Sequence, residues 1–187
     1  RLRGYMRQRD TLIKDTVEHI QHMQKALDQM NVQLHHVVSD ITGATGMQII
    51  RAIVVGERDA HQLASYRDRR CKNSIDVIEA ALVGHYREEH LFSLKQSLEL
   101  YDFYQQKIIE CDKEIEKILK SFESEQQQKS EEDGELCAEK MVFKRSTSKN
   151  KLNFNASISL KKVIGIDLTR IPGINTTTAL IVFSEIG

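Results

Sequence analysis

The clearest chemical pattern in the sequence is the segment LTRIPGINTTTALIVFSEIG, residues 168–187. It has the form of a helix-hairpin-helix element, in which a Pro-Gly turn between two isoleucines joins two short helices. Backbone N–H groups that are exposed at such a turn, just before a helix N-terminus, suit a DNA phosphate. The residues predicted to contact nucleic acid here are Pro172, Gly173, Ile174, Asn175 and Thr176.

Asn175 stands where this motif usually has a second glycine. Asparagine tolerates a positive φ better than most residues do, so the substitution is compatible with the turn. A bare packing corner between two helices is the alternative interpretation of the segment.

A second group of candidate residues lies at the start of the sequence, where Arg3, Arg7 and Arg9 fall in a basic segment. Arg3 and Arg7 are spaced i, i+4 and share one face of a predicted helix, an arrangement that suits contact with phosphate. Salt bridges to the acidic stretch that begins near Glu110 are the alternative role for these arginines.

The sequence predicts no catalytic site and no metal site. His19 and His22 are spaced i, i+3, but no carboxylate or cysteine set accompanies them, and we expect these histidines to be exposed to solvent. The three cysteines, Cys71, Cys111 and Cys137, have no CxxC spacing. The sequence contains no P-loop, no GxSxG, no HExxH and no CxxC pair.

The elements that must position these residues are helical. Hydrophobic residues make up 40% of the chain, aromatic residues only 6%, and there is a single proline, a composition that disfavours a β-sandwich. Apolar residues follow a heptad repeat from Thr11 to Ile41 and again from Arg87 to Phe122, which predicts two long coiled-coil helices. Three short helices are predicted between them, one closed by Gly56 and one capped by Asn73 or Ser74.

The predicted fold class is therefore all-α, with long antiparallel coiled-coil helices, a small helical insert, a flexible linker and a partial helix-hairpin-helix element. Pairing of the long helices between two chains is the alternative to a hairpin within one chain. We assign residues 1–122 to the helical assembly region, 123–160 to a polar and disordered linker, and 161–187 to the hairpin segment.

Two stretches of the chain, about residues 1–122 and 163–187, resemble DEDD-type insertion-sequence transposases of the IS-one-ten family. The first closely resembles the central region of that family and contains YMRQRDTLIKDTVEHIQHMQKALDQMNVQLHHVVSDITGATGMQIIRAIVVGERD, LASYRDRRCK and ALVGHYREEHLFSLKQSLELYDFYQQKIIECDKEIEK. The second, IPGINTTTALIVFSEIG, is similar to the opening of the family's C-terminal domain.

The resemblance implies a mobile-element recombinase. In that family an RNase H-like N-terminal domain holds divalent metal ions such as magnesium with four acidic residues, and a C-terminal domain supplies a serine nucleophile. By the same resemblance, residues 1–10 follow the last acidic ligand and FSEIG precedes the serine, so Ser184 does not match the catalytic position. We therefore expect a truncated transposase without catalytic residues, metal ligands or cofactors of its own.

The implied partners are DNA, a structured guide RNA encoded by the element, and further copies of the chain bound through the coiled coil. No signal peptide or membrane-spanning run is recognisable, and a cytoplasmic location is expected. Two other functions remain open on the sequence alone. One is a structural coiled-coil protein that only oligomerises, and the other is a stand-alone helix-hairpin-helix DNA-binding module.

Overall fold

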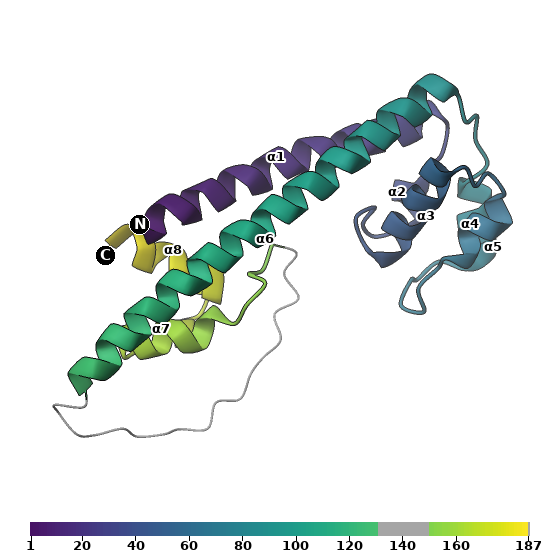
Figure 1. Cartoon of the computed structure of the whole chain (residues 1–187). Helices are drawn as coiled ribbons and strands as arrows, with labels where there is room; N and C mark the ends of the chain where they lie inside the picture. The colour runs from purple at the N-terminus through teal and green to yellow at the C-terminus, as the bar shows by residue number, and fades with distance from the viewer. Residues whose placement is uncertain (131–149, 187) are drawn as a thin grey trace. The chain divides into compact units, whose positions relative to one another are not determined.

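The fold is all-α, as predicted (Figure 1). The computed structural model describes residues 1–130 and 150–186, with the side chains of 125–130 excepted, and this part contains helices and turns but no strand. The helices are α1 (Leu2–Gln29), α2 (Leu34–Val37), α3 (Ala44–Val55), α4 (Ala60–Ser65), α5 (Ile75–Ala81), α6 (Glu88–Ser130), α7 (Ala156–Ile164), the 3-10 turn η1 (Leu168–Arg170) and α8 (Thr176–Ile186).

The chain forms two compact units, and both long helices contribute to each of them. Unit 1 contains residues 1–13 and 106–187, and unit 2 contains residues 14–105. Within each unit the stretches of α1 and α6 run side by side in opposite directions, because the start of one helix pairs with the end of the other. The units therefore do not follow the division at residue 122 that the sequence suggested.

Unit 2 is built around a core of fully buried aliphatic residues from α1, α6 and the short helices between them. Its largest members include Met23, Leu27, Ile49, Leu63 and Leu94. Several of these occupy the predicted heptad positions. Heptad residues of this unit are thus buried or half-buried within a single chain.

The first long helix ends earlier than the heptad repeat predicted. α1 stops at Gln29, and Asn31 then adopts a left-handed conformation with φ 59°. The N–H of Val32 donates to the carbonyl of Leu27 over 2.9 Å and closes the helix end. The later heptad residue Leu34 is buried all the same, but it belongs to α2.

The three short helices that the sequence predicted in unit 2, α3, α4 and α5, follow their local signals. Gly56, with φ 117°, forms the left-handed C-cap of α3, and the side chain of Ser74 accepts from the N–H of Val77 as the N-cap of α5. The side chain of Asp59 caps α4. These helices are therefore confirmed where the sequence predicted them.

Gly84 brings two backbone segments of unit 2 close together. A Cβ atom at this position would overlap the carbonyl oxygen of Met30, which accepts the N–H of His85 over 2.7 Å. We expect Gly84→Ala to lower the free energy of unfolding by about 1–3 kcal/mol, because the backbone has to move. Gly4→Ala is the matched control, since nothing lies within 4 Å of a Cβ there and alanine favours helix. Urea denaturation should move the two midpoints in opposite directions, and equal midpoints would contradict the close approach.

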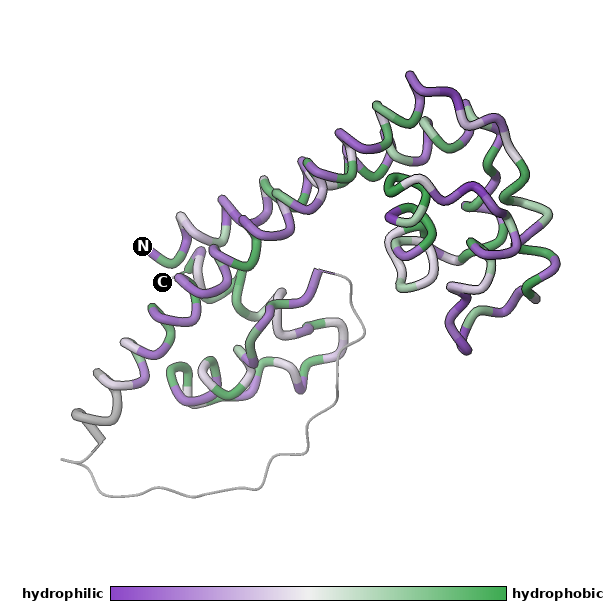
Figure 2. Tube along the Cα trace, turned by 45° about the vertical axis from the view of Figure 1, so that its right-hand side comes forward, coloured by the Kyte–Doolittle hydropathy of each residue, from purple (hydrophilic) through white to green (hydrophobic). Residues whose placement is uncertain are grey.

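Unit 1 has its own core, formed by the start of α1, the second half of α6, α7 and α8. Its buried residues are Leu2, Met6, Ile115, Leu119, Leu152, Ala156, Leu160, Ala179 and Leu180. Along both long helices the hydropathy alternates between polar and apolar, as expected for helices with one apolar face (Figure 2).

Parts of the predicted linker over 123–160 belong to helices or to the core of unit 1. α6 continues to Ser130 and α7 begins at Ala156, and Leu152 is already buried in the core of unit 1. Residues 131–149, which include Cys137, lie outside the described residues. The apolar side chains after residue 150 explain the difference, because they pack on α6. Among the described residues, no helix combines the length and the apolar character that a membrane span requires.

Candidate nucleic-acid interface

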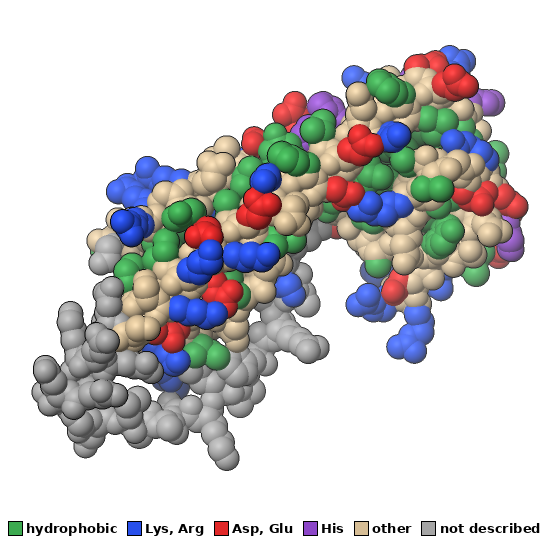
Figure 3. Space-filling view, in the orientation of Figure 1, with side chains coloured by type: hydrophobic (Ala, Val, Ile, Leu, Met, Phe, Trp, Pro, Cys, Tyr) green, Lys and Arg blue, Asp and Glu red, His purple; other side chains and the backbone are tan. Residues whose placement is uncertain are grey.

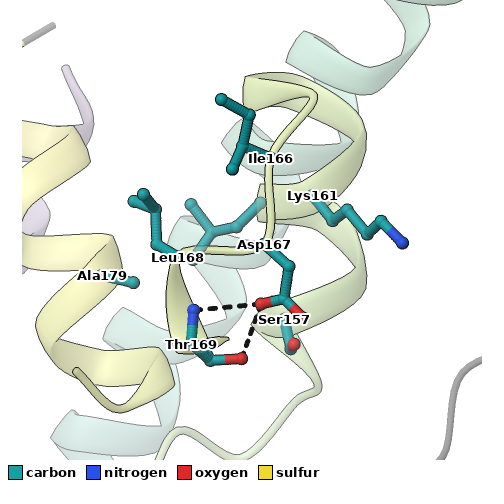
Figure 4. Close-up of a pocket in the computed structure, with 8 residues that line it drawn as sticks. Ser157, Lys161, Ile166, Asp167, Leu168, Thr169 and Ala179 are labelled. Carbon is teal, nitrogen blue, oxygen red and sulfur yellow. Dashed lines mark hydrogen bonds between the residues drawn. The ribbon is translucent and has the colours of Figure 1, made fainter. Parts of the chain in front are cut away.

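The predicted hairpin is formed by α7, η1 and α8, and side-chain caps define each of its turns. The side chain of Asn155 accepts the N–H of Ser157 at the start of α7, and Gly165 closes this helix with φ 79°. The carboxylate of Asp167 then accepts both the N–H and the hydroxyl of Thr169, over 3.0 and 2.6 Å (Figure 4). These hydrogen bonds lower the pKa of the Asp167 carboxyl below its usual value.

The turn before α8 places Gly173, not Asn175, in the left-handed conformation. Gly173 has φ 88°, and Asn31 is the one non-glycine residue with positive φ in the described part of the chain. Asn175 has a different role. Its side-chain oxygen accepts hydrogen bonds from the N–H of Thr178 over 2.8 Å and from the hydroxyl of Thr178 over 3.1 Å. The turn therefore does not use the tolerance of asparagine for a positive φ. Asparagine here is the N-cap of α8.

The five predicted hairpin residues differ in their accessibility. Pro172, Gly173 and Asn175 are exposed. Ile174 packs against the core of unit 1, and its N–H donates to the carbonyl of Ile171. Thr176 is half-buried. The exposed part of the turn is thus Pro172, Gly173 and Asn175, whereas Ile174 anchors it.

Basic residues that the sequence pattern did not single out accompany this turn. Lys161 and Lys162 lie in the last turn of α7, and Arg170 lies in η1. Lys162 pairs with Glu123 over 2.9 Å, and Arg170 is exposed. The sequence signal that could have identified these basic residues is that they precede the Pro-Gly turn closely in the chain. By contrast, acidic and basic side chains are interspersed along α6 on the face in Figure 3. Ion pairs within this helix join residues three or four positions apart.

A small recess lies between α7 and the start of α8, with Asp167 and Thr169 at its edge (Figure 4). Its remaining lining residues are Ser157, Leu160, Lys161, Ile166, Leu168 and Ala179. The space measures about 190 Å³ with its open mouth included, below the roughly 300–1,000 Å³ of ligand pockets. This recess therefore does not support a small-molecule substrate.

Arg3 and Arg7 lie on one face of α1 as predicted, and both contact Glu185 of α8. Nη2 of Arg3 lies 2.7 Å from Oε2 of Glu185. Arg7 donates from Nε to Oε1 over 2.9 Å and from Nη2 to Oε2 over 3.0 Å. The arginines form salt bridges, but their partner is on the hairpin and not in the acidic stretch. Hydrogen bonding to Arg7, followed by the charge of Arg3, lowers the pKa of the Glu185 carboxyl.

Arg9 does not reach the surface in this structure, which corrects its assignment to the phosphate contacts. Its side chain is 3% exposed, and Nε donates to Oδ1 of Asp112 over 2.5 Å. Nη2 donates to the backbone carbonyls of Asn150 and Lys151, while Oδ2 of Asp112 accepts the backbone and side-chain N–H groups of Asn153. The buried ion pair therefore fastens the segment before α7 to α1 and α6.

The remaining polar candidates that the structure describes, Ser184, His19 and His22, have partners or are exposed. Within residues 1–130 and 150–186, no group of three or more His, Cys, Asp and Glu side chains is placed to hold a metal ion. The hydroxyl of Ser184 donates to the carbonyl of Ile181 in its own helix. His22 is exposed as predicted, but His19 is half-buried and stacks on Tyr104 with 5.2 Å between ring centroids.

Comparisons of the chain with protein-family models, with curated proteins and with solved structures returned no match.

Proposed function

We propose that this chain is the assembly and DNA-contact part of an IS-one-ten-type transposase, which binds DNA during transposition without cleaving it. The observation that carries the proposal is the exposed turn at Pro172 and Gly173, immediately before the capped N-terminus of α8. Backbone N–H groups in such a position attract a phosphate. Lys161, Lys162 and Arg170 add positive charge to the same hairpin.

Under this proposal α1 and α6 are the scaffold that holds the hairpin, and the chemistry of strand cleavage belongs to other parts of a transposase. No catalytic residue, metal ion or cofactor is assigned to the chain. A structured guide RNA of the element is a second nucleic-acid ligand with the same phosphate chemistry, and the cytoplasm is the proposed compartment. Arg9 takes no part in binding because it is buried.

The proposal is tested by adding one negative charge beside the turn without changing the fold of the hairpin. Asn175→Asp retains an N-cap, since aspartate caps helices as well as asparagine does, but it places a negative charge beside the turn. We expect weaker binding to duplex DNA and a salt dependence of log K that is shallower by about 1, the loss of one phosphate contact.

Asn155→Asp is the matched control, because it makes the same change at the N-cap of α7. In the sequence, α7 and η1 lie between that cap and the turn. Binding is measured across a salt series, and the far-UV circular dichroism of both variants is expected to equal that of the wild type. Equal binding by the two variants would show that the turn before α8 does not contact DNA.

A second candidate is the structural protein that only oligomerises. The observation in its favour is a set of exposed apolar side chains on α6, namely Phe92, Leu100 and Phe103, which are 63%, 44% and 54% exposed. The heptad residues of α1 and α6 are used within the chain, so self-association needs a different face. Solution mass recorded with the DNA titration separates the two functions, because an oligomer that binds neither DNA nor structured RNA fits only this one.

A further inference from the structure

Arg3, Arg7 and Glu185 form an anion-binding arrangement that is already filled. The two guanidinium groups hold one carboxylate with three contacts of 2.7 to 3.0 Å, and Arg7 contributes a bidentate pair. Guanidinium groups donate hydrogen bonds to two oxygens of a phosphate in the same geometry. The site therefore has the donors that a phosphate ligand needs, with the Glu185 carboxylate in its place.

The charges in this cluster are unequal. Two guanidinium groups face one carboxylate, so the three side chains together carry a net charge of +1. The side chains of Arg3, Arg7 and Glu185 are 52%, 63% and 34% exposed, and salt bridges of that exposure stabilise a fold only slightly. Replacing the carboxylate by an external anion consequently costs the fold little.

We propose that Arg3 and Arg7 form a phosphate-binding site that Glu185 occupies in the absence of nucleic acid, so that Glu185 competes with the backbone phosphates for the same donors. The identity of the anion as a DNA phosphate rests on the proposed function. Glu185 is carried by α8, the second helix of the hairpin. Binding at the turn and release of Glu185 thereby involve the same helix.

Glu185→Gln tests the competition, because it removes the charge and keeps the length and helix propensity of the side chain. We expect duplex DNA to bind about tenfold more tightly at 0.1 M salt, with a salt dependence of log K steeper by about 1 to 2, as both guanidinium groups become available. In an Arg3→Ala, Arg7→Ala background, the same Glu185→Gln change should give no gain.

Glu110→Gln is the matched control for the change in net charge. Glu110 is exposed, lies in unit 1 and pairs with Lys107 over 2.8 Å. We expect its variant to gain much less affinity than Glu185→Gln. An equal gain, or a Glu185→Gln gain that persists without the two arginines, would overturn the proposal, since the effect would then follow from net charge alone.

A small anion distinguishes failure of the proposed function from failure of the anion-binding site. If no variant binds DNA, inorganic pyrophosphate is titrated into the wild type and Glu185→Gln while the Nε–H signals of the arginines are followed by ¹⁵N NMR. The site predicts a shift of the Arg7 signal at lower pyrophosphate concentration in Glu185→Gln than in the wild type. An Arg7 signal that does not move in Glu185→Gln overturns the anion site itself, whatever the outcome with DNA.

Discussion

Replacing Asp112 by alanine is expected to lower the free energy of unfolding of unit 1 by about 3–5 kcal/mol. Asp112 is 1% exposed and Arg9 is 3% exposed, so the variant leaves a guanidinium charge buried without its carboxylate. It also removes the acceptor of two N–H groups of Asn153. The loss therefore combines an unpaired charge with unsatisfied amide donors.

Asp102→Ala is the control for this variant. Asp102 also accepts two hydrogen bonds from an arginine, Arg51, over 2.6 and 2.8 Å, but both side chains are largely exposed. Its removal should cost no more than about 1 kcal/mol. Chemical denaturation gives the stabilities, and hydrogen exchange at the Asn153 amide reports on the contact directly. An Asn153 amide that exchanges equally slowly in Asp112→Ala and in the wild type would show that Asp112 does not hold this segment.

Leu27→Asp should disrupt unit 2, with a loss of about 4 kcal/mol or more. Leu27 is 1% exposed in the core that contains Met23 and Leu94. The change removes a buried aliphatic side chain, which alone costs roughly 2–5 kcal/mol, and it adds a carboxylate without a partner. Such a loss is a large share of the roughly 5–15 kcal/mol that stabilises an ordinary domain.

Val17→Asp offers a matched comparison on the same helix. Val17 is 46% exposed, and valine and aspartate have similar helix propensities, so its variant should stay within about 0.5 kcal/mol of the wild type. Urea denaturation followed by far-UV circular dichroism measures both. If Leu27→Asp folded as well as Val17→Asp but changed only the mass in solution, Leu27 would belong to an interface between chains.

The short helices α3, α4 and α5 could be predicted because their signals are local. Ser74 and Gly56 act through hydrogen bonds and dihedral angles within a few residues, and such signals can be read from the sequence. The end of α1 could not be predicted in this way, because heptad spacing reports burial and not helix continuity. Leu34 satisfies the repeat and is buried, yet the helix has ended at Gln29.

The candidate site could be predicted only in part, because only some of its features depend on local sequence. The Pro-Gly turn with a left-handed Gly173 is a local feature, and it is present. The burial of Arg9 depends on Asp112, which is 103 residues away, and no local pattern indicates that pairing. Likewise the partner of Arg7 is Glu185 and not the nearer acidic stretch, because tertiary packing brings α8 against α1.

The contacts of unit 1 also set the order in which the chain can fold as it is synthesised. Arg7 and Glu185 are 178 residues apart. The first turns of α1 therefore leave the ribosome long before Glu185 of α8 has been synthesised. Unit 2 consists of one continuous stretch, residues 14–105, and contacts of shorter sequence separation form faster. During synthesis unit 2 can therefore fold first, while the apolar face of Leu2 and Met6 is covered only later, by α6 residues such as Ile115 and then by α8 residues such as Leu180.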